Sequence, residues 1–135
     1  MLVVPLGVHA KESLKHSPPF YGHPDSWRAG YRYLVTLWRN EVKGVYEVLE
    51  SVTTNPVGDA ACPAPNNFPK PTWETLASSP GYRVSVLKPL DETDQRLGRF
   101  LNKRYSKKGP QGRGAAFTQT HRYLEHPEDL GDYFA

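Results

Sequence analysis

The sequence lacks the features that mark secreted and membrane-spanning proteins. Its single cysteine, Cys62, cannot form a disulfide within the chain, which favours a reducing, intracellular compartment over a disulfide-stapled secreted domain. No apolar run approaches the roughly 18 residues that cross a bilayer. The apolar segment 1–8 has neither a basic region before it nor a small-residue cleavage site, so we expect no secretion signal. The mitochondrion stays among the compartments allowed, through import without a cleaved presequence.

Catalytic and metal-binding motifs are missing as well. Cys62 lies among prolines rather than at a helix start, and no Gly-x-Ser-x-Gly elbow occurs. His121 and His126 are five positions apart, whereas a helical zinc pair needs four. The glycines of segment 107–114 lack the Walker spacing of a phosphate loop. We therefore predict no catalytic residue, no metal site and no cofactor. A small nuclease that uses His121 as a base is kept as an alternative.

The composition indicates a small folded unit with extended segments. The chain has 135 residues, enough for one domain. Only 38% of them are apolar, below the usual share of about 45–50%, and the 13 prolines far exceed the average share of about 5%. The 8 tyrosines, 5 phenylalanines and 3 tryptophans argue against disorder, because disordered chains are poor in aromatic residues. Such a chain suits a folded core with proline-rich arms that lie on a partner.

The net charge of +3 hides a strongly uneven distribution of charged residues. Segment 96–122 carries eight cations and no Asp or Glu. These cations are Arg96, Arg99, Lys103, Arg104, Lys107, Lys108, Arg113 and Arg122. Cations in such a run can meet the phosphates of a nucleic acid, and Tyr105, Phe117 and Tyr123 lie among them for stacking on bases. An acidic protein, a lipid headgroup and plain solvation are alternative explanations of the same run.

Segment 26–52 is the main periodic segment, and its pattern allows two structures. Apolar residues follow one another at steps of three or four, and polar residues form a second, interleaved stripe. This pattern predicts an amphipathic helix. A β-hairpin is the rival interpretation, because residues 31–37 alternate, residues 45–54 are rich in β-branched side chains and segment 40–44 could turn. We favour the helix because the polar stripe has no gaps.

Two further elements follow along the chain. Residues 82–87 alternate between apolar and polar side chains, which predicts a short strand. Segment 91–107 predicts a second helix, with acids in its first turn and cations in its last turns, as the helix dipole favours. We expect Leu97, Leu101 and Tyr105, at steps of four, to pack this helix against the first.

These elements together predict an α+β, mainly α fold: a small two-helix mini-domain with one or two short strands and extended Pro-rich arms. Residues 1–24 form an extended N-terminal arm, and residues 25–135 form a single small domain that a Pro-rich loop at 55–73 interrupts. Within it a basic helix and loop cover 91–122, and an acidic, aromatic tip covers 123–135. The residues expected to dock on partners are Phe20, Tyr21, Phe68, Trp73, Tyr133 and Phe134.

The leading functional hypothesis is a non-catalytic small subunit of a large assembly, above all a ribonucleoprotein such as the ribosome. The basic helix and loop would contact RNA phosphates, and the arms would contact other protein subunits. The second hypothesis is an accessory subunit of a protein-only assembly, such as an organellar respiratory complex or a viral particle. Neither hypothesis requires a transmembrane segment, and none is predicted.

Overall fold

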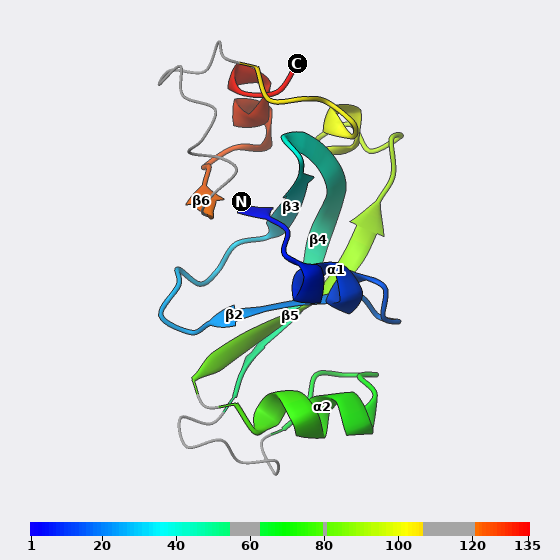
Figure 1. Ribbon diagram of the computed structural model, residues 1–135, viewed down its shortest axis with the longest axis vertical. Helices are drawn as coiled ribbons and strands as arrows, with labels where there is room; N and C mark the ends of the chain where they lie inside the picture. The colour runs from blue at the N-terminus through cyan, green and yellow to red at the C-terminus, as the bar shows by residue number, and fades with distance from the viewer. Residues whose placement is uncertain (55–62, 80, 107–120) are drawn as a thin grey trace. The chain divides into compact units, whose positions relative to one another are not determined.

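The computed structural model describes residues 1–54, 63–79, 81–106 and 121–135 (Figure 1). Its elements are β1 (Leu2–Pro5), α1 (Val8–Leu14), β2 (Phe20–Pro24), β3 (Tyr33–Trp38), β4 (Glu41–Thr53), α2 (Lys70–Ala77), β5 (Tyr82–Leu90), the 3-10 turn η1 (Gly98–Phe100), β6 (Arg122–Tyr123) and the 3-10 helix η2 (Pro127–Asp132). The fold is mainly β, with 38% strand and 21% helix. The predicted α+β, mainly α class with a two-helix core is therefore wrong.

A mixed sheet of six strands organises the chain, in the order β2-β5-β4-β3-β1-β6. β1 runs parallel to β3, with Leu2 opposite Leu34, whereas β6 pairs with β1, β5 with β2 and β4 with β3 in antiparallel fashion. Residues 1–24, which were expected to extend over a partner, supply β1, α1 and β2. The prediction of an extended arm fails here because short apolar runs such as 2–4 are buried as strands within the sheet.

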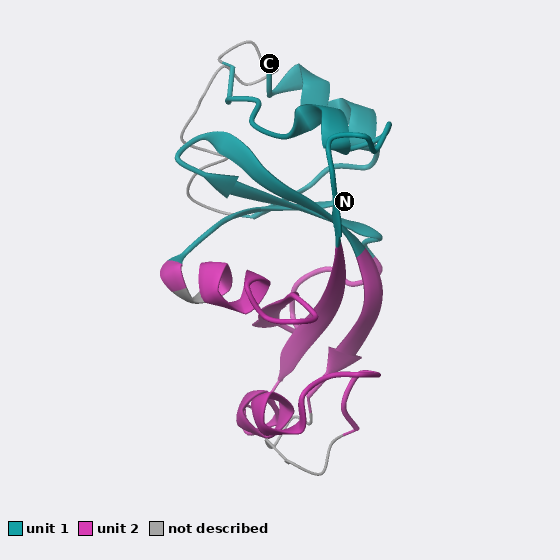
Figure 2. Ribbon diagram, turned by 90° about the vertical axis from the view of Figure 1, so that its right-hand side faces the viewer, with its two compact units in different colours: residues 1–7, 31–47, 89–135 teal, residues 8–30, 48–88 magenta. Residues whose placement is uncertain are grey.

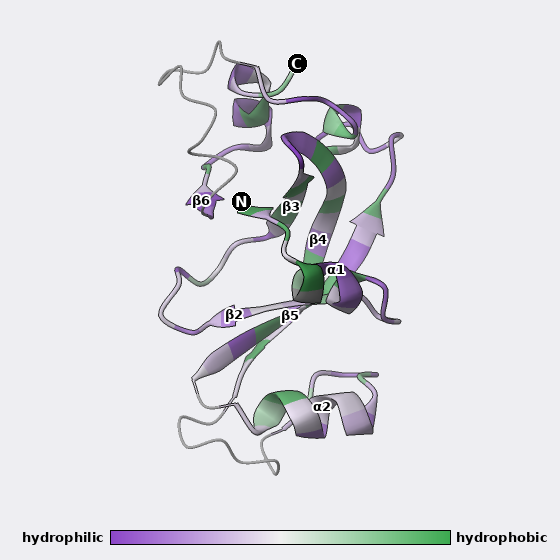
Figure 3. Ribbon diagram, in the orientation of Figure 1, coloured by the Kyte–Doolittle hydropathy of each residue, from purple (hydrophilic) through white to green (hydrophobic). Residues whose placement is uncertain are grey.

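Segment 26–52 contains the rival hairpin rather than the favoured helix. β3 and β4 pair around Arg39 and Asn40, whose φ angles are 51° and 66°. Positive φ at both central residues is the backbone of a type I′ turn, whose twist matches that of the flanking strands. Figure 3 shows hydrophobic and hydrophilic bands alternating along β4. The β-branched residues of this segment and the helix-weakening Gly44 outweigh the apparent helical stripe, because they pack well on a pleated, half-buried surface.

The helix predicted over 91–107 is also wrong. Within its described part, residues 91–106, only Gly98–Phe100 is helical, as the single turn η1. The carboxylate of Asp94 accepts the backbone N–H groups of Arg96 and Leu97 at 3.0 and 2.7 Å. Such local side-chain bonds offer the backbone an alternative to the helix. The acidic residues of this segment therefore stabilise turns instead of starting an α-helix, although Leu97 is fully buried.

The strand and the loop predicted between these two segments have different outcomes. The strand predicted at 82–87 is confirmed as β5, which continues past Pro89 to Leu90. Within the predicted Pro-rich loop 55–73, residues 55–62 lie outside the described part of the chain, and α2 begins at Lys70. Pro71 fits the first turn of α2, because a backbone N–H there would have no partner within the helix.

The chain divides into two compact units, shown in teal and magenta in Figure 2. Unit 1 comprises residues 1–7, 31–47 and 89–135, and unit 2 comprises residues 8–30 and 48–88. Unit 1 has a core of buried apolar side chains. They are Val3, Val35, Leu37, Val42, Val45, Leu97, Phe100, Leu130 and Phe134. One face of β1, β3 and β4 thus packs against side chains from η1, from η2 and from the residue next to the C-terminus.

The core of unit 2 forms around Trp73 of α2. The rings of Phe20 and Phe68 meet edge to face with centroids 5.2 Å apart, and those of Phe68 and Trp73 do so at 6.1 Å. Val84 and Val86 of β5 complete this cluster. Edge-to-face pairs of this kind add about 0.5–1.5 kcal/mol each beyond the burial of apolar area. Three of the aromatic residues expected to dock on a partner therefore lie in the core of unit 2.

Candidate nucleic-acid interface

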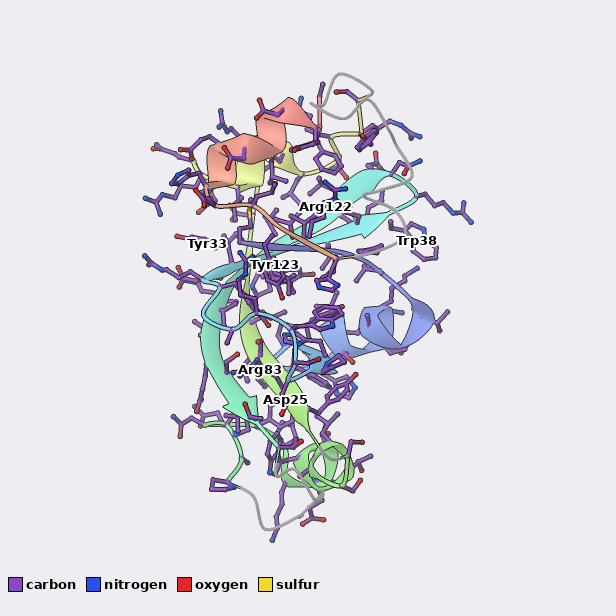
Figure 4. All side chains as sticks on the ribbon, turned by 90° about the vertical axis from the view of Figure 1, so that its left-hand side faces the viewer. Asp25, Tyr33, Trp38, Arg83, Arg122 and Tyr123 are labelled. Carbon is purple, nitrogen blue, oxygen red and sulfur yellow. The ribbon has the colours of Figure 1, made fainter. Side chains whose placement is uncertain are left out.

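The β3–β4 turn of unit 1 presents a tryptophan and an arginine together. Trp38, the last residue of β3, is half-buried, and Arg39, which follows it, is exposed. The guanidinium carbon of Arg39 lies 5.6 Å from the centroid of the Trp38 ring, within the range of a cation–π contact. Figure 4 shows Trp38 at the end of β3, projecting away from the ribbon. The turn therefore offers an aromatic ring and a cation in one place.

Residues 102–106 run beside this turn. The Tyr105 N–H donates to the carbonyl of Asn40 at 2.6 Å, and the Val42 N–H donates to the carbonyl of Lys103 at 2.9 Å. Backbone bonds of this kind pair the basic segment with the hairpin as a strand would, in place of the predicted helix. Because these bonds are made by main-chain atoms, the side chain of Lys103 stays exposed.

The same segment pairs on its other side with residues 133–135. Arg104 and Ala135 exchange two backbone hydrogen bonds, at 3.0 and 3.2 Å. We call the main chain of residues 40–42, 102–106 and 133–135 the seam. Since its middle segment is hydrogen-bonded on both sides, the seam fixes Lys103 and Arg104 beside the β3–β4 turn.

Four exposed cations lie on or next to the turn and the seam. They are Arg39, Lys43, Lys103 and Arg104, which we call the cationic cluster. Among them, the backbone of Glu41 pairs with that of Arg104 in an isolated β-bridge, and the Glu41 carboxylate is ion-paired with Lys43. The hydrogen bond from Lys43 lowers the pKa of Glu41, and the charges of Lys43 and Arg104 lower it further. One ionised carboxylate thus stands against four cations, and the cluster keeps a net positive charge.

A hollow of about 250 Å³ opens beside the cationic cluster. It is lined by Pro5, Leu6, Leu37, Trp38, Arg39 and Asn40. Its lining combines Trp38 and apolar residues with the polar residues Arg39 and Asn40. The hollow is smaller than most small-molecule sites, which measure about 300–1,000 Å³. It therefore suits one part of a larger ligand, such as a single base, better than a whole small molecule.

The other cations predicted to meet phosphates are placed differently. Arg96 donates a hydrogen bond of 3.1 Å to the hydroxyl of Tyr33, which raises the pKa of Arg96. The guanidinium of Arg99 lies 4.6 Å from the centroid of the Phe100 ring, and Arg122 lies in β6. Lys107, Lys108 and Arg113 lie outside the described residues. The structure thus brings Lys103 and Arg104 of the predicted set to the turn, whereas Arg96 and Arg99 engage aromatic side chains of unit 1.

Three residues of the site escaped the sequence analysis. Trp38, Arg39 and Lys43 fall on the stripes of a helix that does not form. A usable signal was the pair Arg39-Asn40 between two alternating runs, because Asn tolerates the positive φ of a hairpin turn. The pairing of this turn with residues 102–106 could not be predicted from a local sequence pattern, because it joins distant parts of the sequence.

The aromatic residues expected to dock on partners belong to the packing of the chain itself. Tyr21 is 7% exposed and Phe134 2% exposed, and Tyr133 packs against the core of unit 1. The Phe134 ring meets that of Tyr105 edge to face at 5.9 Å. Together with Phe20, Phe68 and Trp73, these rings supply core area that the low apolar content of the sequence would otherwise lack.

Other kinds of site have less support. Among the described residues, no three His, Cys, Asp or Glu side chains gather as a metal site would require. The same part of the chain has no helix with the length and apolar character needed to cross a membrane. Burial lowers the pKa of His121, so its ring is neutral at pH 7, and it meets Tyr123 edge to face at 5.6 Å.

Comparison of the chain with protein-family models, with curated proteins and with solved structures found no match. The β3–β4 turn of unit 1 and the seam beside it are therefore the basis for a functional proposal.

Proposed function

We propose that this protein is a non-catalytic RNA-binding protein, a small subunit of a ribonucleoprotein, and that it contacts RNA through the β3–β4 turn of unit 1. The observation that carries the proposal is the contact between Arg39 and the Trp38 ring at a turn whose backbone is hydrogen-bonded to the basic segment 102–106. Arg39 and Lys43 come from the hairpin, and Lys103 and Arg104 come from the seam. Exposed Lys and Arg side chains next to a partly exposed aromatic ring are the parts that single-stranded nucleic-acid sites combine.

The cations supply the affinity for phosphate. Arg and Lys release counterions from a nucleic acid when they meet its phosphates, which makes binding depend strongly on salt. Glu41 offsets the charge of its ion-pair partner Lys43 but does not cancel the cluster, because three further cations remain. Arg39 is the member with the most defined position, since its guanidinium lies over the Trp38 ring.

The tryptophan supplies a surface for a base. Base–aromatic stacking contributes about 1–3 kcal/mol per base and tolerates any sequence. In RNA, unpaired bases of loops and ends are the ones that can be splayed out and stacked on aromatic side chains. The hollow lined by Trp38, Pro5 and Leu37 has the size for one such base. Unpaired RNA therefore fits this surface better than a duplex.

The proposal is tested by the salt dependence of RNA binding. The probe is a fluorescently labelled single-stranded RNA of about 20 nucleotides and mixed sequence, followed by anisotropy from about 50 to 300 mM salt. The test variant replaces Arg39, Lys103 and Arg104 with Ala. The control replaces Arg28, Lys70 and Lys88, three exposed cations of unit 2, with Ala. Each chain loses three positive charges, so only the position of the charges differs.

The test variant should bind more weakly, and its slope of log affinity against log salt should be shallower by about 2. Each phosphate of a single strand that a cation neutralises accounts for roughly 0.7 of that slope. The control should keep most of its slope. The fold should survive in the test variant because the seam is made of backbone bonds. No binding by the parent protein at low salt, or equal weakening in the two variants, would refute the proposal.

A further inference from the structure

Unit 2 contains a larger hollow, of about 480 Å³. Helix α1, strand β2, Leu76 of α2 and Tyr82 of β5 enclose it. Glu12, His16, Phe20 and Gly22 are among the residues that line it. Its volume lies within the range of about 300–1,000 Å³ that is usual for small-molecule sites. The function proposed for unit 1 makes no use of it.

The inner wall of this hollow includes the ring of Tyr82. A Cβ atom on Gly22 would lie 2.6 Å from a ring carbon of Tyr82, so the Tyr82 ring rests directly on the backbone of β2. Its hydroxyl lies 3.5 Å from the Gly22 carbonyl. The ring of His16 stands 5.3 Å from that of Phe20. Gly22 therefore allows a close approach that keeps an aromatic surface at the wall, and flat rings are the ligands that such a surface favours.

The rim of the hollow carries one carboxylate, on Glu12. Glu12 pairs with Lys15 at 3.4 Å, but the two side chains are 65% and 70% exposed. An ion pair with that exposure is weak, so a ligand can displace Lys15 at little cost. An ionised carboxylate only accepts hydrogen bonds, and it accepts two in parallel. The ligand that suits it carries two adjacent N–H donors on a flat ring.

We infer that this hollow binds the guanine base of a nucleoside. Guanine presents a ring N–H and an amino group side by side on its Watson–Crick edge, which matches the two oxygens of Glu12. Adenine and cytosine place a ring acceptor next to the amino group, and uracil places its N–H between two carbonyl oxygens. A carboxylate is repelled by these acceptors. The half-buried ring of Tyr82 takes the flat face of the base. The inference goes beyond the function of unit 1, because it requires no contact with phosphate.

The experiment measures binding of four free nucleosides to the full chain by isothermal titration calorimetry. Guanosine is the probe, and adenosine, cytidine and uridine are its competitors. Glu12→Gln replaces one acceptor oxygen by a donor amide at an exposed position. Ala10→Phe fills the hollow from α1. Glu74→Gln, on the exposed side of α2, is the matched control for the loss of a carboxylate.

Guanosine should bind at least fivefold more tightly than the other three nucleosides. Glu12→Gln and Ala10→Phe should each weaken its binding at least tenfold, and Glu74→Gln should leave it unchanged. If Ala10→Phe unfolds the chain, the test rests on Glu12→Gln. Because Glu12 is exposed, this substitution should leave the melting temperature unchanged. Absent guanosine binding, equal affinity for all four nucleosides, or full affinity in Glu12→Gln would each overturn the inference.

Failure here is distinguishable from failure of the RNA proposal. The variant that lacks Arg39, Lys103 and Arg104 should bind guanosine as the parent chain does, because a nucleoside carries no phosphate. A parallel loss of guanosine binding in that variant would count against a separate base site in unit 2.

Discussion

Arg39 holds its guanidinium 5.6 Å from the centroid of the neighbouring Trp38 ring while its backbone adopts a φ of 51°. For a residue other than Gly, Asn or Asp, left-handed backbone costs roughly 1–2 kcal/mol. Asn and Gly are the usual residues of a type I′ turn, and Arg is not. A costly backbone at a position with a defined side-chain contact is typical of functional sites. Arg39 therefore lowers the stability of the hairpin through its backbone, whereas its side chain serves the proposed binding of RNA.

Arg39→Asn should make the protein more stable and a poorer RNA binder. Asn tolerates the positive φ, so the free energy of unfolding should rise by about 1 kcal/mol. Loss of the cation should weaken RNA binding and reduce its salt slope by about 0.7. Urea unfolding and anisotropy measure the two effects on the same sample. If Arg39→Asn loses both stability and affinity, the backbone of Arg39 does not cost the hairpin stability.

Trp38→Ala should weaken binding without changing the salt slope. Stacking of a base on the indole contributes about 1–3 kcal/mol and releases no counterion. Trp38→Phe, which keeps an aromatic ring, should retain part of the affinity. Anisotropy titrations at several salt concentrations separate affinity from slope. If the slope of Trp38→Ala changes as much as that of the variant that lacks Arg39, Lys103 and Arg104, stacking is not the role of the ring.

Gly98→Ala should destabilise unit 1 strongly. A Cβ atom at this position would collide with the backbone oxygen of Asp91, and a backbone atom cannot swing away as a side chain does. Overpacking of this kind costs about 3 kcal/mol. Gly131→Ala is the control, since its Cβ would meet Phe100 at an ordinary 3.8 Å. Urea midpoints that fall equally in the two variants would mean that residues 91–98 are arranged otherwise.

Lys43→Gln should raise the pKa of Glu41, because the hydrogen bond from Lys43 is the largest cause of its lowering. The folded-state pKa lies below the ordinary value of 4.5. The contribution of Glu41 to stability is therefore present above that value and is lost as the pH falls through the folded pKa. An NMR titration of the Glu41 carboxyl carbon measures the change. Lys70→Gln in unit 2 should leave the titration as it was.

The parts of the fold that sequence reasoning predicted are those with one consistent local pattern. Residues 82–86 alternate between apolar and polar side chains, and they lie in β5. Segment 26–52 carried two patterns at once, and the hairpin formed because β-branched residues and Gly44 suit a sheet. The acids of segment 91–107 resembled the first turn of a helix, but Asp94 bonds the nearby backbone instead.

The site was predictable only in part, for a different reason. The run of cations in segment 96–122 singled out Lys103 and Arg104, because charge composition is a local property. Arg39 and Lys43 belong to the hairpin, which backbone hydrogen bonds link to the distant segment 102–106. Sequence periodicity cannot predict bonds of that kind. The aromatic residues were recognised as anchors, yet their partners lie within the chain: Phe68 packs on Phe20 and Trp73.

The seam makes the charged surface depend on residues that carry no charge. Arg104 keeps its place through two backbone bonds to Ala135, and Ala135 is anchored by the adjacent Phe134, which is 2% exposed. Local opening of residues 133–135 would leave Arg104 held from one side alone, by the bonds of its neighbours Lys103 and Tyr105 to the hairpin, while every cation remained present. A cavity at Phe134 would therefore loosen the position of Arg104, and weaken the proposed contact with a polyanion, without changing the charge of the surface.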